Sequence, residues 1–88
     1  MDIEDWRRQI DELDAAIVET LNRRMRCSLE IGKIKRNQGL PIYAPEREAS
    51  ILDRVVSLST GPLGGAALRR VFQQIIEESR GLEQERSE

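Results

Sequence analysis

The chain has 88 residues, which make one domain, and a domain of this size buries little surface when it folds alone. It contains no histidine and a single cysteine, Cys27, which excludes an internal disulfide, a Cys/His zinc site and a nucleophile activated by histidine. A net charge of −2 weighs against nucleic acid as a partner. The polar, acidic start and the lack of any membrane-length apolar stretch predict a cytoplasmic protein without a membrane partner.

An apolar stripe predicts one long first helix from Ile3 to about Asn37, before Gly39 and Pro41. The stripe recurs in steps of three and four at Ile3, Trp6, Ile10, Leu13, Ile17, Thr20, Arg24, Cys27, Ile31 and Ile34. Such a helix spans roughly 50 Å. Because a compact monomer of this length has a radius of gyration of only about 12 Å, the helix must project beyond its own fold. Its apolar stripe then needs a second chain, and a homodimer is the simplest solution.

Two shorter helices are expected to follow. Pro45 suits the first position of the second helix, although Ala44 is a poor cap. Its inner side is predicted to carry Ile51, Leu52, Val55 and Leu58. After a loop over residues 59–65, a third helix is expected from about Ala66 to Glu83. Its inward residues are predicted to be Leu68, Phe72, Ile75 and Ile76. The chain is therefore predicted to be an all-α domain, residues 1–88, with its core over 4–84 and a frayed tail over 85–88 that also affects Gln84.

The middle of the first helix is strongly basic. Residues 23–36 carry six cationic side chains against one carboxylate, Glu30, which suggests a small anionic ligand in an otherwise acidic protein. Arg24 takes a core position of the stripe, and Ser28, Ile31 and Lys35 follow on the same face at spacings of four, seven and eleven. Arg24 and Lys35 can thus reach toward each other across an anion. Alternatively, Arg24 fixes the helix register and Lys35 is solvated.

The other two helices carry polar residues of similar interest. On the third helix Ser79 and Glu83 continue the apolar stripe, which is also the pattern of a helix end fraying into solvent. Arg47 and Glu48 lie in the first turn of the second helix. A glutamate in a first turn is favoured by the helix dipole and by itself says nothing about function.

The ordered set of these residues resembles the AroQ-type chorismate mutase family over about residues 4–84. The set comprises Arg7, Arg24, the run Ile31-Gly32-Lys33-Ile34-Lys35, Pro41, Arg47, Glu48, Phe72, Ser79 and Glu83. The resemblance implies a stand-alone bacterial enzyme of aromatic amino-acid biosynthesis that rearranges chorismate to prephenate. It also implies that the three helices of each subunit intertwine in a homodimer with two equivalent sites.

By this resemblance Arg24 and Arg7 of the partner subunit hold the two carboxylates of chorismate, and Ser79 hydrogen-bonds near one of them. Glu48 receives the ring hydroxyl, with Arg47 beside it. Arginine suits the first task because its planar fork binds a carboxylate bidentately.

The resemblance further implies that Lys35 donates to the ether oxygen of the breaking C–O bond. Glu83 stands where the family has Gln or Glu as a second donor, and a carboxyl there has to be protonated to donate. The catalytic set is thus Lys35 and Glu83 together with the two arginines. The chain departs from a bacterial relative at Ala44, where that relative has Asp. A pericyclic rearrangement needs positioning and donors toward growing negative charge, so we expect neither a metal nor a cofactor.

Two other functions remain open. Isochorismate-pyruvate lyases share the fold, and the segment 44–47 resembles theirs, whereas Glu48 and Ser79 favour a mutase. A non-catalytic helical dimerisation module would also explain the apolar stripe. It would leave four residues without a role: Arg7, Arg24, Lys35 and Glu83.

Overall fold

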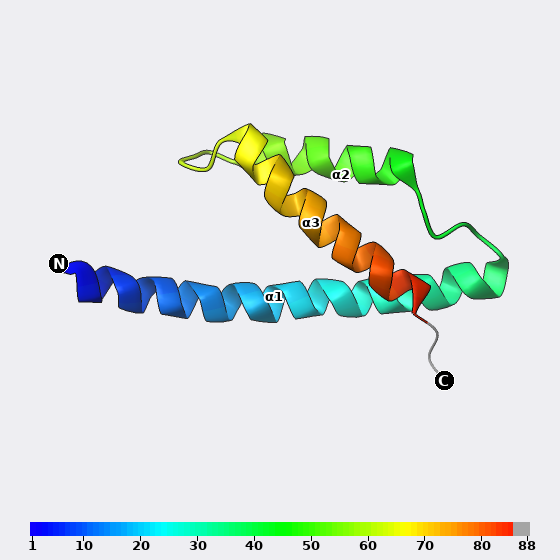
Figure 1. Ribbon diagram of the computed structural model, residues 1–88, viewed down its shortest axis with the longest axis horizontal. Helices are drawn as coiled ribbons and strands as arrows, with labels where there is room; N and C mark the ends of the chain where they lie inside the picture. Colours follow the sequence, from blue (N-terminus) through cyan, green and yellow to red (C-terminus); the bar gives the residue numbers. More distant parts are fainter. Residues whose placement is uncertain (86–88) are drawn as a thin grey trace.

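The computed structural model describes residues 1–85, which form three helices joined by two connections (Figure 1). Helix α1 spans Ile3–Gln38, α2 spans Pro45–Leu58 and α3 spans Gly65–Gln84. The prediction of an all-α chain with three helices and a long first one is confirmed. Gln84 is the last residue of α3, and Glu85 follows it in extended conformation. The rest of the expected frayed tail, 86–88, lies outside the described residues.

Both ends of α1 are closed by local hydrogen bonds. At the start, the Asp2 carboxylate accepts from the Asp5 amide at 2.9 Å, and the Asp5 carboxylate accepts from the Asp2 amide at 3.0 Å. At the far end, Gly39 adopts a left-handed conformation with φ of 67°. The Leu40 amide then donates to the Lys35 carbonyl at 2.8 Å, which ends the helix just before Pro41.

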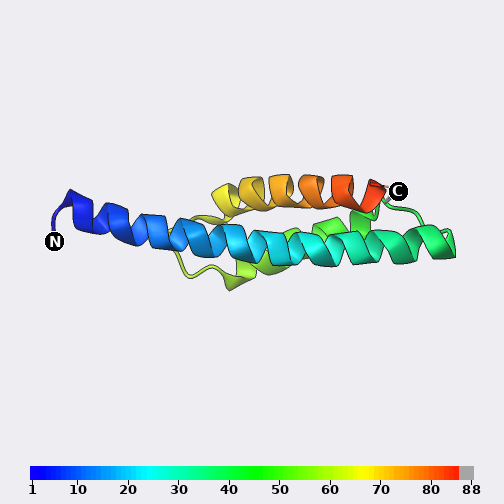
Figure 2. The same cartoon turned by 90° about the horizontal axis from the view of Figure 1, so that it is seen from below.

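The long helix makes the molecule elongated, as the sequence predicts. Its dimensions are 54 × 29 × 14 Å and its radius of gyration is 16.1 Å, against about 12 Å for a compact chain of this length. The N-terminal part of α1 extends well beyond α2 and α3 (Figures 1 and 2). From residue 1 to residue 20 every side chain is exposed except that of Asp5, which is half-buried.

Helix α3 joins the other two. It packs against both α1 and α2, whereas these two helices, as far as they are described, approach no closer than 8 Å between Cα atoms. Within residues 1–85, Ile76 on α3 is the one buried large apolar side chain, with 3% of its surface exposed. The prediction that Leu58 faces inward is wrong, because it is 63% exposed at the end of α2, and among residues 1–85 this helix packs against α3 alone.

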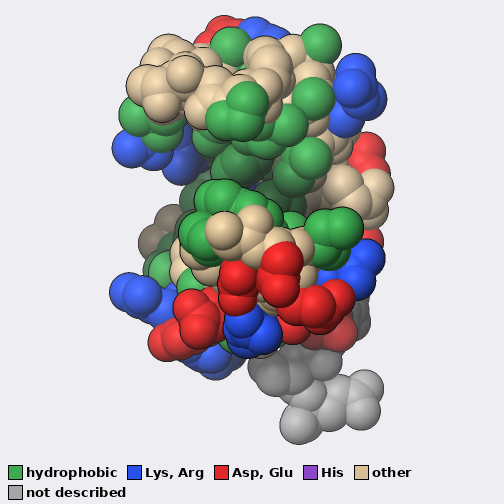
Figure 3. Space-filling view, turned by 90° about the vertical axis from the view of Figure 1, so that its left-hand side faces the viewer, with side chains coloured by type: hydrophobic (Ala, Val, Ile, Leu, Met, Phe, Trp, Pro, Cys, Tyr) green, Lys and Arg blue, Asp and Glu red, His purple; other side chains and the backbone are tan. Residues whose placement is uncertain are grey.

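A row of apolar side chains on α1 therefore lacks a partner within residues 1–85. Its exposed members include Ile3, Trp6, Ile10, Leu13, Ile17, Ile31 and Ile34. Seen from the N-terminal end of α1, hydrophobic side chains gather around a notch between α1 and the α2–α3 pair, and charged side chains lie on the opposite side of α1 (Figure 3). None of the helices within residues 1–85 is long and apolar enough to cross a membrane.

Candidate active site

A cavity of about 470 Å³ lies where the C-terminal half of α1, the start of α2 and the end of α3 meet, and we call it the central cavity. Its size falls in the usual range for small-molecule sites, about 300–1,000 Å³. It is lined by Arg24, Cys27, Ser28, Ile31, Lys35, Ile42, Ala44, Arg47, Glu48, Ile51, Ile76, Ser79 and Glu83. The predicted face of α1, from Arg24 through Ser28 and Ile31 to Lys35, thus lines one cavity.

Most of the site residues expected from the sequence line the central cavity. From α1 come Arg24 and Lys35, and the other two helices supply Arg47, Glu48, Ser79 and Glu83. Arg7 is absent from it. Its side chain is 67% exposed and forms an ion pair with Glu4, with 2.7 Å between Nη1 and Oε1. Arg7 and Arg24 are separated by roughly 25 Å along α1, so a single chain does not bring them together.

Lys35 and Glu83 form an ion pair at one end of the central cavity. The Nζ atom of Lys35 lies 2.6 Å from Oε1 of Glu83, and it also donates to the carbonyl oxygen of Ile42 at 3.0 Å. The two side chains are only 18% and 14% exposed. The alternative interpretations, a solvated Lys35 and a frayed Glu83, are therefore wrong. An ammonium has three N–H donors, so one remains for a bound molecule.

The backbone around Glu83 packs closely on α1. Arg36 donates from Nη1 to the Glu83 carbonyl oxygen at 2.5 Å. One turn earlier, the buried Gly32 lies against the same stretch of backbone. The sequence pattern predicts a role for neither residue, although Gly32 stands in the run Ile31–Lys35 that carried the resemblance.

Arg24 and Ser79 form the other end of the polar lining. The Arg24 guanidinium donates to Oγ of the buried Ser79, whose hydroxyl contacts the sulfur of Met25 at 3.3 Å. Burial lowers the pKa of Arg24, the positive charge of Arg47 lowers it further, and Glu83 and Cys27 act in the opposite direction. Within residues 1–85 neither Arg24 nor Arg47 forms an ion pair. A bound anion would offset both the cost of burying the Arg24 charge and its repulsion by Arg47.

Glu48 is held by Arg80, a residue that no sequence pattern indicates. Arg80 of α3 donates from Nε to Oε2 of Glu48 at 3.0 Å and from Nη2 to Oε1 at 2.7 Å. The hydrogen bond from Arg80 to Glu48 is the main cause that raises the pKa of Arg80. The Arg80 guanidinium also lies over the Tyr43 ring, 4.7 Å from its centroid. No spacing rule links Glu48 to Arg80, because the two residues lie 32 positions apart on different helices.

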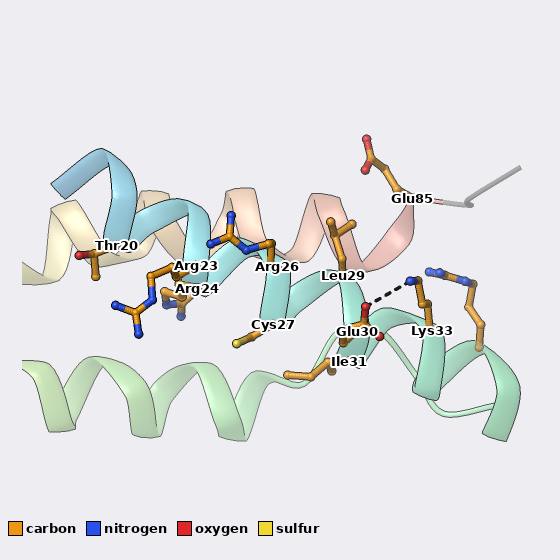
Figure 4. A pocket seen from close by; sticks show the side chains of 11 residues that line it. Thr20, Arg23, Arg24, Arg26, Cys27, Leu29, Glu30, Ile31, Lys33 and Glu85 are labelled. Carbon is orange, nitrogen blue, oxygen red and sulfur yellow. Dashed lines mark hydrogen bonds and ion pairs between the residues drawn. The ribbon is translucent and has the colours of Figure 1, made fainter. Parts of the chain in front are cut away.

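A wider hollow of about 1240 Å³ runs along α1 (Figure 4). Apart from Glu85 it is lined by α1 alone, at Thr20, Arg23, Arg24, Arg26, Cys27, Leu29, Glu30, Ile31, Lys33 and Arg36. In Figure 4, Cys27 and Ile31 lie on the side of α1 toward α2, and Lys33 pairs with Glu30. Since Arg24 is its only predicted site residue, the central cavity is the better candidate. Among the described residues no cluster of carboxylates and cysteine could hold a metal ion.

Comparison with known proteins identifies similar sequences. Residues 6–84 match the family described as chorismate mutase type II. The bifunctional chorismate mutase/prephenate dehydratase of Aquifex aeolicus is 34% identical over 86 residues, which cover 93% of this chain and 24% of that protein. The chain thus spans about a quarter of the length of the bifunctional relatives that it matches.

Solved structures are similar over nearly the whole chain. Form II of the Thermus thermophilus chorismate mutase superposes with a TM-score of 0.93 at 30% identity and covers 98% of both chains. The Helicobacter pylori chorismate mutase, solved in complex with prephenate, superposes with a TM-score of 0.83 at 33% identity, over 92% of this chain and 88% of that one.

Proposed function

This chain belongs to the chorismate mutase type II family, and we propose that it catalyses the rearrangement of chorismate to prephenate. The observation that carries the proposal is the convergence of Arg24, Lys35 and Arg47 with Ser79 and Glu83 in the central cavity. The complex of the Helicobacter pylori relative with prephenate supports the same substrate class. The cytoplasmic location expected from the sequence stays part of the proposal.

Arg24 binds one carboxylate of the substrate dianion, and Arg47 adds positive charge nearby. Arg24 and Arg47 repel each other, and within residues 1–85 no carboxylate pairs with either of them. A carboxylate between or beside them replaces this repulsion by charge-assisted hydrogen bonds. Ser79 fixes the Arg24 guanidinium by accepting from one of its donors and leaves the others for the ligand. This arrangement selects and holds the compact conformer that reacts.

Lys35 donates to the ether oxygen as the C–O bond breaks. Its ammonium is already oriented by Glu83 and by the Ile42 carbonyl, so its third N–H is held in place before the substrate arrives. A donor that is oriented in advance stabilises growing negative charge without reorganisation. Glu83 supplies the second donor from its other carboxyl oxygen when that oxygen carries a proton. Glu48 accepts the ring hydroxyl, with Arg47 beside it at the start of α2.

The same proposal includes an intertwined homodimer, in which α1 of a second copy lies antiparallel along the notch between α1 and the α2–α3 pair. This helix would cover the exposed apolar row that includes Trp6, Ile10, Leu13 and Ile17. Each large apolar side chain that it buries contributes about 1.5–3 kcal/mol. Arg7 of the partner subunit would then complete the central cavity as the second carboxylate-binding arginine.

The test is to supply the purified chain with chorismate and, separately, with isochorismate, and to separate the products by chromatography. We expect prephenate from chorismate and no salicylate or pyruvate from isochorismate. The Arg24→Ala variant is the control for a contaminating enzyme, because it should lose the activity. A folded chain that leaves chorismate unchanged would contradict the proposal, and release of pyruvate from isochorismate would favour the lyase.

A further inference from the structure

The bidentate contact between Arg80 and Glu48 lies at the central cavity and has no role so far. Both oxygens of the Glu48 carboxylate accept from the Arg80 guanidinium, at 3.0 Å and 2.7 Å. The Arg80 side chain is only 29% exposed and that of Glu48 only 17%. Glu48 lines the cavity, whereas Arg80 lies behind it and does not. Any effect of Arg80 on a bound molecule therefore passes through Glu48.

Arg80 is itself fixed from its other side. Its guanidinium lies over the ring of Tyr43, 4.7 Å from the centroid, in the geometry of a cation–π contact. Tyr43 belongs to the connection between α1 and α2, and its neighbour Ile42 accepts the hydrogen bond from Lys35. Arg80 thus links α3 to the first turn of α2 and to this connection, which lies between the two proposed substrate contacts, Lys35 and Glu48.

We propose that Arg80, supported by Tyr43, is a positioning residue that holds the Glu48 carboxylate toward the ring hydroxyl of the substrate. The inference rests on the proposed function. A glutamate side chain has three rotatable bonds, and the planar fork of Arg80 restrains all of them. An ionised carboxylate has about four acceptor positions, so Glu48 can accept a hydroxyl while Arg80 occupies two of them.

A purely structural role for Arg80 is the alternative, and the chain offers a matched control. Arg69 of α3 pairs with Asp53 of α2, with 2.8 Å between Nη2 and Oδ1. This pair joins the same two helices, but neither residue lines the central cavity. Loss of either ion pair weakens the α2–α3 contact, whereas only loss of the Arg80 pair changes the orientation of Glu48.

The experiment compares Arg80→Met, Arg69→Met, Glu48→Ala and the Arg80→Met/Glu48→Ala double variant by kcat, KM and thermal unfolding. We expect Arg80→Met to lower kcat/KM about tenfold. This loss should be divided between kcat and KM in the same proportion as the loss caused by Glu48→Ala. Arg69→Met should change kcat/KM less than about twofold. Once Glu48 is absent, Arg80→Met should change kcat/KM less than about twofold further.

Two results would overturn the inference: equal effects of Arg80→Met and Arg69→Met, or an undiminished effect of Arg80→Met without Glu48. If Arg80→Met fails to fold by circular dichroism, Arg80→Lys takes its place, because it keeps the charge and the stem but loses the fork. Arg80→Lys should lower kcat/KM about threefold at an unchanged unfolding temperature, and unchanged kinetics would overturn the inference. An inactive unmodified chain would instead reject the proposed function, and with it this role of Arg80.

Discussion

Gly32 of α1 lies directly against the backbone of Glu83 in α3. A Cβ atom added to Gly32 would lie 2.6 Å from the Glu83 carbonyl oxygen and 2.8 Å from its Cα atom, both far inside van der Waals contact. The two helices can therefore approach this closely only because residue 32 has no side chain. This approach sets the position of Glu83 relative to Lys35, which lies nearly one turn further along α1.

Gly32→Ala should consequently separate α1 and α3 beside the central cavity. We expect a loss of stability of about 1–3 kcal/mol from overpacking, and a loss of kcat/KM of more than about tenfold because the Lys35–Glu83 pair is displaced. Gly81→Ala in α3 is the control, since a Cβ atom there meets nothing within 4 Å and alanine favours a helix by about 0.5–1 kcal/mol. Thermal unfolding and steady-state kinetics test both variants. Wild-type stability and activity of Gly32→Ala would show that the close approach has no importance.

Lys35→Ala should act mainly on the chemical step. The ether oxygen gains charge only as its bond breaks, so a donor toward it stabilises the transition state more than the bound substrate. We expect kcat to fall about 100-fold or more with little change in KM. Arg24→Ala should also raise KM, because its carboxylate partner is charged from the start. Initial rates over a range of chorismate concentrations separate the two constants, and a change in KM alone for Lys35→Ala would contradict the role proposed for it.

Arg7 and Arg24 should complement each other between subunits. If each site takes Arg24 from one chain and Arg7 from the other, Arg7→Ala and Arg24→Ala should each be nearly inactive as a pure protein. After complete subunit exchange of an equal mixture, half of the dimers are mixed and each has one intact site, which restores about a quarter of the wild-type activity. Exchange is followed with a mass-tagged chain. Complete exchange without recovery would place Arg7 outside the site.

The sequence predicts relationships within one helix better than those between helices. Arg24 and Lys35 line one cavity because the rotation per residue of an α-helix is fixed, and spacing alone therefore places them on one face. The contact of Arg80 with Glu48 depends on how α3 crosses α2, which no local pattern encodes. Lys35 also donates to the backbone carbonyl of Ile42, and the identity of a residue does not show whether its backbone carbonyl accepts such a bond.

Leu58 shows that even a relationship within one helix can lead to a wrong prediction of burial. Helical periodicity places it on the apolar side of α2, but among residues 1–85 α3 does not cover it, and the residue is exposed. Periodicity predicts the face of a helix on which a residue lies. It does not predict whether another element covers that face, nor whether that element belongs to the same chain.

The ion pair between Lys35 and Glu83 places an acid with two possible roles in the site. As a carboxylate, Glu83 orients the Lys35 ammonium, with 2.6 Å between Nζ and Oε1. A carboxylate facing the ether oxygen would also repel the negative charge that develops there, whereas the neutral acid donates a hydrogen bond to it. Catalysis should therefore favour the protonated form of Glu83 in the complex with the substrate dianion.

Glu83→Gln tests this directly, because the amide can donate to the ether oxygen at every pH. In the unmodified chain only the protonated carboxyl can donate to the ether oxygen, so the activity of Glu83→Gln relative to the unmodified chain should rise with pH. Glu85→Gln removes the same charge from an exposed side chain just beyond α3, so it should keep the original profile. The measurement is kcat against pH for the three proteins, with circular dichroism at each pH, and identical profiles would mean that Glu83 does not face the substrate.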